Sequence, residues 1–365
     1  MRAEVSSPES HAAQPVIERS FVQRVAIVYG LGVLFMLALA ALWFGADVLL
    51  LIFACILFAL LLHELSRRLA NRLRCRRGIA LAIVVLVLLA VIGGGGALMA
   101  PQIGEQAAKL GTVVPETIEQ LRAAVQKNAF LRSLATDLPS SEQIRKQLLS
   151  LVPNAGLFFS GVLGALGNVI IIAFVGLYFA AQPKVYVDGF VTLIPQAHRP
   201  RAREVLDEIG RTLAQWLLGK SISMVVVGCA TAIGLSLLGV PLALILGVIA
   251  GLLDFIPYVG PLMAGVPAVL IAFSINPTLG VSTIALFVAI QLLEGYLVSP
   301  LIEAKTVSLP PALTVVMQLL FGALFGLAGV ALATPLSAVL MILTVMLYVQ
   351  DVLHDDVQPP SRTDS

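Results

Sequence analysis

The chain has 365 residues, of which 59% are hydrophobic and 12% are charged, and its mean hydropathy is +0.97. The charged fraction is about half that of soluble globular proteins, so the composition excludes an ordinary soluble domain and indicates a membrane protein. A formal net charge of +2 is too small to suggest a nucleic-acid partner. Neither the three cysteines nor the four histidines show metal-ligand or disulfide spacing, so we expect no metal and no cofactor.

The amino-terminal part predicts a polar tail and three membrane spans. Residues 1–20 are polar and are expected to form a disordered cytoplasmic tail. Residues 21–100 hold spans near Val25–Trp43, Val48–His63 and Ile79–Ala100, and the first begins too late for a cleaved signal. The loop between the second and third spans is rich in arginine, which predicts a cytoplasmic position for it and for the amino terminus. Its arginines are Arg67, Arg68, Arg72, Arg74, Arg76 and Arg77.

The next three segments differ in their polarity. Residues 101–155 are polar, with an apolar stripe of helical period, and predict an extracytoplasmic amphipathic insert that packs on neighbouring subunits or the membrane surface, or captures a ligand. Residues 156–195 contain a fourth span at Gly156–Ala181. Residues 196–219 place arginines opposite apolar side chains, which is typical of a helix lying at the cytoplasmic membrane interface.

Residues 220–350 predict a transmembrane core in which simple counting becomes ambiguous. Ser221–Leu238 and Thr278–Val298 are long enough to span, but Pro241–Asp254 and Val259–Phe273 are too short. The short pair forms either one broken crossing or a re-entrant hairpin. Pro310–Leu347 is too long for one ordinary crossing. We therefore predict an all-α polytopic membrane protein of about eight transmembrane helices, with a disordered cytoplasmic tail at residues 351–365.

The sequence GLLDFIPYVGP, residues 251–261, is the strongest candidate for a functional site. Asp254 lies in apolar sequence, where a carboxylate needs a cation, a proton or another partner, or else caps the helix beginning near Pro257. Pro257, Gly260 and Pro261 break the helix and free backbone carbonyls for coordination. Broken helices of this kind line ion and substrate pathways in transporters.

Two further polar residues are candidates for the same pathway. Glu294 lies near the end of the predicted span 278–298 and is either an interfacial carboxylate or a second acid beside Asp254. Gln291 precedes it by one turn on the same helical face and can add a hydrogen-bonding group.

The long carboxy-terminal segment contains glycines at helix-packing spacing. Gly322, Gly326 and Gly329 predict close helix contact, and Pro335 is expected to break the segment after them. A second discontinuous helix facing the first is the alternative.

Four segments resemble signature blocks of the autoinducer-2 exporter (AI-2E) family of bacterial membrane proteins. They are WLLGKSISMVVVG, GVPLALILGVIAGLLDFIPYVGPLMAGVPAVLIAF, QLLEGYLVSPLIEAKTVSLPPALTVV and FGALFGLAGVALATPL. The resemblance implies a multi-pass inner-membrane transporter of about eight helices, often a homo-oligomer. The arginine-rich loop and an even number of crossings separately predict that both termini lie in the cytoplasm. Lys220 and Pro310 depart from the residues that relatives often carry.

The function expected from these features is secondary transport. We expect an exporter of a small polar or amphiphilic solute such as autoinducer-2, coupled to an ion gradient through the intramembrane carboxylates, with a quorum-sensing role implied by the resemblance. The alternative is a sodium(lithium)/proton antiporter without organic cargo, and a membrane scaffold or regulator is a further one. No catalytic residues are expected, because the sequence has neither a nucleotide-binding loop nor the motifs of intramembrane proteases. The partners expected are the solute or ions and the lipid bilayer.

Overall fold

A computed structural model describes residues 45–91, 93–95, 155–298 and 310–355, and residues 29, 32 and 36. Every regular element within these ranges is helical, which confirms the all-α fold class. The predicted first span, most of the extracytoplasmic insert and most of both tails lie outside the described residues. The chain divides into two units, Met1–Leu49 and Leu50–Ser365, and the second unit contains all the candidate site residues.

Helix α2, Ala46–Leu73, runs ten residues beyond the predicted end of the second span at His63. The arginine-rich segment is therefore largely helical, where we had predicted a loop. The reason is local: Glu64 forms ion pairs with Arg67 at 2.6 Å and Arg68 at 2.9 Å, at the spacings that stabilise helices. The chain turns at Arg74, which has a positive φ of 52°, before a further apolar helix at Arg77–Gly95.

Three helices follow in the described chain. Helix α6, Ala155–Ala181, matches the predicted fourth span, and the described part of α6 bends by 83° into α7, Pro183–Thr192. After a short 3-10 turn, η1 (Gln196–His198), helix α8 runs unbroken from Arg199 to Leu237. Our division of this region into an interfacial helix and a separate span is wrong, because no proline interrupts the helix after Pro200. At 1.5 Å per residue α8 is about 58 Å long, well beyond a hydrocarbon core of about 30 Å.

Helices α9, Ala243–Leu253, and α10, Val259–Ile275, form an antiparallel hairpin. Leu246 of α9 packs in one cluster with Ala268 and Ile271 of α10, which requires the chain to reverse between the helices. A Cβ on Gly260 would lie 1.8 Å from the Leu253 carbonyl oxygen, so this turn needs glycine. Of the two predicted arrangements, the structure has the hairpin.

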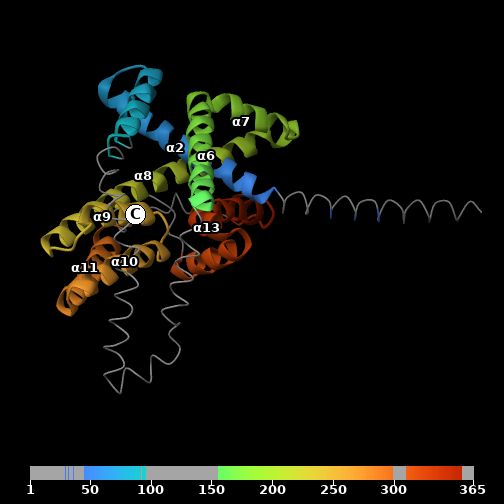
Figure 1. The fold of residues 1–365 in the computed structure, drawn as a ribbon. Helices are drawn as coiled ribbons and strands as arrows, with labels where there is room; N and C mark the ends of the chain where they lie inside the picture. Colours follow the sequence, from blue (N-terminus) through green and yellow to red (C-terminus); the bar gives the residue numbers. More distant parts are fainter. Residues whose placement is uncertain are drawn as a thin grey trace, which may run out of the picture. The chain divides into compact units, whose positions relative to one another are not determined.

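Helix α11, Pro277–Leu293, continues into a π-helical segment η2, Glu294–Val298, in agreement with the span predicted at 278–298. Asn276 caps its start by accepting a 2.6 Å hydrogen bond from the Leu279 amide. Figure 1 shows α9, α10 and α11 gathered beside α8, and α10 packs against both α9 and α11.

Helix α13, Pro311–Leu343, and the π-helical η3, Thr344–Gln350, are the last helical elements of the described chain, and α13 reverses at Gly326. Gly326 has φ 62° and ψ −146°, a conformation that is essentially restricted to glycine. A Cβ on Gly322 would lie 2.7 Å from Val330 Cγ2, whereas eight residues of straight helix span about 12 Å. The expected break at Pro335 is wrong, since Pro335 is buried inside the helix and glycine supplies the reversal.

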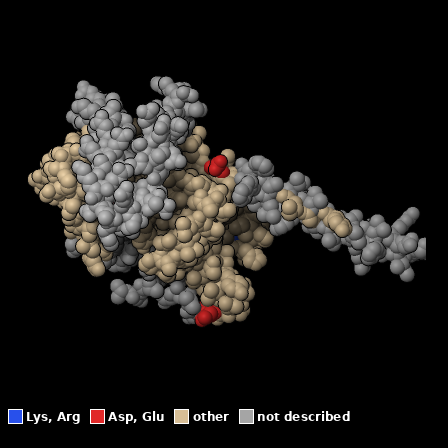
Figure 2. Space-filling model, turned by 60° about the horizontal axis from the view of Figure 1, so that its bottom comes forward, with Lys and Arg blue, Asp and Glu red and all other residues tan. Residues whose placement is uncertain are grey.

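The described residues contain five helices long and apolar enough to cross a membrane, or six when the bent pair α6–α7 counts as one span. The predicted total of eight stays a prediction. Large hydrophobic side chains such as Phe174, Val225 and Leu319 are more than half exposed, which suits a surface in contact with lipid. On the face in Figure 2, the described surface is almost entirely uncharged, with two small acidic patches.

Candidate functional site

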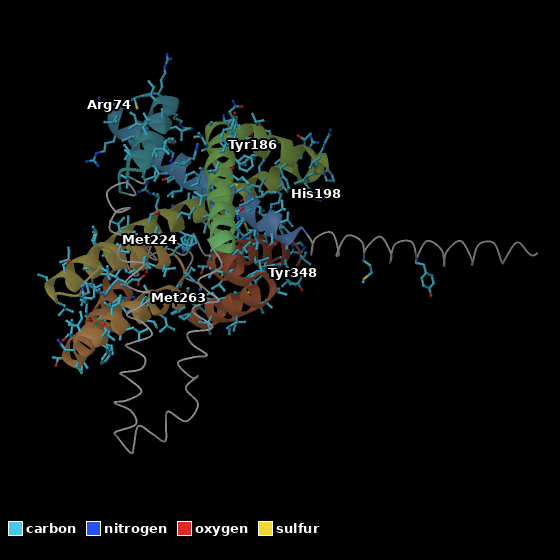
Figure 3. All side chains as sticks on the ribbon, in the orientation of Figure 1. Arg74, Tyr186, His198, Met224, Met263 and Tyr348 are labelled. Carbon is cyan, nitrogen blue, oxygen red and sulfur yellow. The ribbon has the colours of Figure 1, made fainter. Side chains whose placement is uncertain are left out.

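Glycines bring α8 and α9 into backbone contact and thereby fix the level of the site. A Cβ on Gly251 would lie 2.6 Å from the Met224 carbonyl oxygen, and one on Gly247 would lie 2.5 Å from Ala232 Cβ. These pairs run in opposite directions along the two helices. Continuing that register by one turn places Asp254, the C-cap of α9, opposite Lys220 of α8. Met224, labelled in Figure 3, marks this level of α8.

Four polar side chains meet at this level and form a connected network. Lys220 Nζ lies 3.0 Å from Asp254 Oδ2 and 3.2 Å from Glu294 Oε1. Ser223 Oγ, one turn along α8 from Lys220, lies 3.0 Å from the same two carboxylate oxygens. The network therefore joins α8, the tip of the α9–α10 hairpin and the start of the η2 segment.

The network is sheltered from solvent. The side chains of Asp254, Lys220 and Glu294 are 1%, 12% and 14% exposed. Asp254 Oδ1 is fully buried and has no hydrogen-bond partner among the described residues. A carboxylate oxygen that is buried without a donor loses its hydrogen bonds to water and gains none from protein, which costs free energy. This atom therefore marks a site that lacks one hydrogen-bond donor.

The charges of the network do not balance when both carboxylates are ionised. Two ionised carboxylates and one ammonium give −2 + 1 = −1 within a mostly buried cluster. Buried charge is tolerated where it is paired or where the group takes up a proton. The arrangement can therefore accept one positive charge, either a proton or a monovalent cation, and release it again when its surroundings change.

An aromatic contact and an apolar cluster hold the two hairpin tips beside α8. The rings of Trp216 and Phe255 meet edge to face with centroids 5.7 Å apart. Phe255, from the first hairpin, and Phe325, beside the reversal at Gly326, both pack against one cluster that includes Leu217. Both tips thus pack against one cluster to which α8 contributes, and Phe255 of the first tip contacts α8 at Trp216, four residues before Lys220.

Among the described residues, one hydrogen bond between a side chain and the backbone joins the hairpins directly. The Gln318 amide, on the first arm of α13, donates from Nε2 to the Pro257 carbonyl oxygen at 2.9 Å. Gln318 is buried, being only 4% exposed. Because the Val259 amide also donates to this oxygen at 2.7 Å, the carbonyl freed by the broken helix has two protein donors, as apolar surroundings require.

The predicted site residues separate into two groups in the structure. Asp254 and Glu294 come together, and neither remains an isolated carboxylate. Helix α10 begins at Val259 without a side-chain cap, so Asp254 is a network member and not the cap of that helix. Among the described contacts, no hydrogen bond connects Gln291 or Pro261 to the network. Gln291 lies half-buried one turn before Glu294, and Pro261 lies in the first turn of α10.

The glycines predicted to pack helices lie at the second hairpin. Gly322 and Gly329 face the opposite arm so closely that a Cβ on Gly329 would lie 2.0 Å from the Phe321 carbonyl oxygen. Gly326 makes the reversal itself. None of these three residues takes part in the polar network.

Sequence reasoning missed Lys220, Ser223 and Gln318 as members of the site. Lys220 was noticed only as a departure from relatives, although a lysine within an apolar helix of a membrane protein is itself a signal of function. The small-residue spacing of Gly228, Gly247 and Gly251 could have indicated which helices pair. No sequence signal predicts the partner of Gln318, which depends on the reversal at Gly326.

The described residues contain no group of three or more His, Cys, Asp or Glu side chains able to hold a metal ion. The expected lack of a metal and of a cofactor stays a prediction.

Comparison with known proteins agrees with this architecture. The family model described as AI-2E family transporter matches residues 33–348. The candidate transport protein YueF of Bacillus subtilis is 27% identical over 275 residues, which cover 72% of this chain and 74% of YueF. The candidate transport protein YhhT of Escherichia coli K12 is 24% identical over 304 residues, covering 82% of this chain and 85% of YhhT.

A third relative carries a different name for the same kind of protein. The candidate permease PerM of Escherichia coli K12 is 26% identical over 167 residues, covering 45% of this chain and 47% of PerM. The family match extends over most of the chain and includes both hairpins and the polar network. With its apolar helices, the chain is a multi-pass membrane protein, and it belongs to the AI-2E family of transporters.

Proposed function

We propose that this protein is a secondary exporter of a small polar or amphiphilic solute such as autoinducer-2, driven by an ion gradient. The observation that carries the proposal is the buried network at the tip of the α9–α10 hairpin, where two acids share one lysine and Asp254 Oδ1 has no partner among the described residues. Ionisable groups at a broken helix are the usual coupling element of secondary transporters.

In this mechanism the network couples charge to the position of the hairpin. Uptake of a proton or cation by Asp254 and Glu294 neutralises the site and lowers the cost of moving it through an apolar environment. Release restores the negative charge and favours contact with water or a counter-ion. The hairpin tip, including Pro257, Gly260 and Pro261, then moves as a unit and exposes the solute alternately to the two sides.

The cellular setting follows from the same proposal. We place the protein in the bacterial inner membrane with both termini in the cytoplasm, since the arginines at the end of α2 favour that side. We also propose a homo-oligomer, in which residues 101–155 contact neighbouring subunits. An ATP-driven mechanism is not proposed, because the sequence has no phosphate-binding loop.

The second candidate function is sodium(lithium)/proton antiport without organic cargo. The same acidic pair favours it, since two carboxylates sharing a lysine can exchange small cations as readily as they can couple a solute. The two functions differ in whether solute movement is required for ion movement.

The test is transport by the purified protein in proteoliposomes. Autoinducer-2 and other small polar solutes are loaded, and efflux is followed with an imposed proton gradient, a sodium gradient or neither. The matched variants are Asp254→Asn and Asp188→Asn, because Asp188 is an exposed carboxylate of α7 paired with Arg203 and lies outside the network.

We expect gradient-stimulated efflux in the wild type and in Asp188→Asn, and loss of stimulation in Asp254→Asn. Cation–proton exchange that is abolished by Asp254→Asn, without movement of any solute, would establish the antiporter instead. Equal rates with and without protein for every solute and ion would overturn both functions.

A further inference from the structure

Lys220 lies where a coupling cation would bind between the two acids. Its ammonium lies between the carboxylates of Asp254 and Glu294, at 3.0 and 3.2 Å, and only 12% of its side chain is exposed. A sodium ion bridging the two acids would occupy the same space and carry the same charge. Lys220 therefore already fills the place of a monovalent cation.

The groups facing this position leave room for only one further positive charge. Helix α8 contributes Lys220 and Ser223, the α9–α10 tip contributes Asp254 and η2 contributes Glu294, while the nearby Gln318 of α13 is neutral and donates to the Pro257 carbonyl. Helices α9 and α10 contribute no other charged group to the network among the described residues. With both acids ionised, the net charge is −1, and a single proton brings it to zero.

The hydrogen bonds of Ser223 also indicate that the network takes up one proton. Ser223 Oγ has one proton but lies 3.0 Å from an oxygen of each carboxylate, so it can donate to only one of them. The other contact becomes a hydrogen bond when that carboxylate is protonated and donates to Ser223 Oγ. Asp254 Oδ1, fully buried without a described partner, adds to the cost of leaving both acids ionised.

We propose that Lys220 is a tethered substitute for the coupling cation, so that this site exchanges one proton, shared by Asp254 and Glu294, and does not bind sodium. This inference rests on the proposed function and specifies its coupling ion. In the loaded state the shared proton forms the hydrogen bond to Ser223, and on release it passes to water from the carboxylate pair. Replacing Lys220 with a neutral residue vacates the cation position.

The first experiment measures sodium binding and needs no solute. Purified wild type, Lys220→Gln, Lys220→Gln/Asp254→Asn and Lys220→Arg are titrated with ²²Na⁺ at constant ionic strength maintained with choline. We expect background binding in the wild type and in Lys220→Arg, which both retain a cation. Lys220→Gln should bind sodium saturably, approaching a single ion per chain, and the double variant should lose that binding because one carboxylate is gone.

Two results would overturn the inference: saturable sodium binding by the wild type that Asp254→Asn removes, or a folded Lys220→Gln protein that binds no sodium. Recovery of Lys220→Gln only from sodium-containing buffer would support it. If Lys220→Gln folds in neither buffer, efflux by the wild type tests the inference instead. Efflux driven by a pH gradient in sodium-free vesicles would support proton coupling, and efflux that requires sodium would contradict it. Failure of every solute to move would refute the proposed exporter and leave the sodium-binding result to be judged separately.

Discussion

The two hairpins share a shape and differ in chemistry. Both reverse an apolar helix within a few residues, and both tips pack against the cluster beside Trp216 and Leu217. The α9–α10 tip contains Asp254 and joins a network with Lys220 and Glu294. The α13 tip at Gly326 contributes apolar side chains and glycine to this region. We infer that the first tip carries ion coupling, whereas the second supports it.

The difference indicates how a membrane transporter can separate stability from function. Close glycine packing and apolar contacts hold both hairpins without ionised groups. The charged network contributes an unbalanced buried charge, which is costly for stability and useful for binding an ion. Changes at glycine should therefore affect folding, and changes at the acids should affect transport.

The largest expected effect on folding comes from filling the glycine contacts. Gly260→Ala and Gly329→Ala would place a Cβ 1.8 and 2.0 Å from backbone carbonyl oxygens, which the hairpins cannot accommodate without opening. We expect each to lose more than about 4 kcal/mol of stability and most of the folded yield. Size-exclusion profiles of the solubilised protein measure the folded yield.

Gly189→Ala is the matched control, because a Cβ there meets no atom within 4 Å. It should retain the wild-type profile. Normal yield of Gly260→Ala would mean that the reversal at the first tip is not as tight as the structure has it.

A smaller effect is expected from the bond between the hairpins. Gln318→Leu removes one of two donors to the Pro257 carbonyl, since the Val259 amide also donates to it at 2.7 Å, so the loss should cost about 0.5–1.5 kcal/mol. We expect a lower melting temperature and a severalfold slower efflux rate per folded molecule, because the first tip loses its support. Gln291→Leu removes an amide outside the network and should change neither quantity. Equal behaviour of the two variants would show that the hairpins act independently.

The smallest effect is expected at the exposed end of α8. Arg203 pairs with Asp188 at 2.7 Å, but both side chains are more than half exposed. Exposed ion pairs contribute about 0–1 kcal/mol, so Arg203→Gln should leave the melting temperature and transport nearly unchanged. A large loss of transport would mean that this end of α8 takes part in coupling.

Much of the architecture could be predicted from the sequence, because hydrophobic length and composition determine membrane helices locally. The spans at 156–181 and 278–298 needed no tertiary information, and neither did the presence of two short helices around Asp254, but the sequence left open whether these two form a hairpin. The continuity of α8 and the helical arginine segment were missed because charge alone does not end a helix when ion pairs along it support it. Helix α2 has i,i+3 and i,i+4 pairs, and α8 has two i,i+3 pairs.

The site was only half predictable. Asp254 and Glu294 are conspicuous because carboxylates are rare in apolar sequence. Both carboxylates contact Lys220 and Ser223 only because α8 packs against α9 in one register, and the close glycine contacts between these helices set that register. The break was predicted at Pro335 because proline usually breaks helices. The chain instead reverses at Gly326, which adopts a backbone conformation that only glycine tolerates well.

The division of roles between the hairpins is tested most directly by the efflux rate per folded molecule of Asp254→Asn compared with Gly326→Ala. Asp254→Asn changes the charge of the network from −1 to zero, so we expect a melting temperature equal to or above the wild type and almost no gradient-driven efflux. Gly326→Ala should lose about 1–3 kcal/mol of stability from backbone strain while its folded fraction transports normally. Wild-type, gradient-driven efflux by Asp254→Asn would contradict the assignment of ion coupling to the first hairpin.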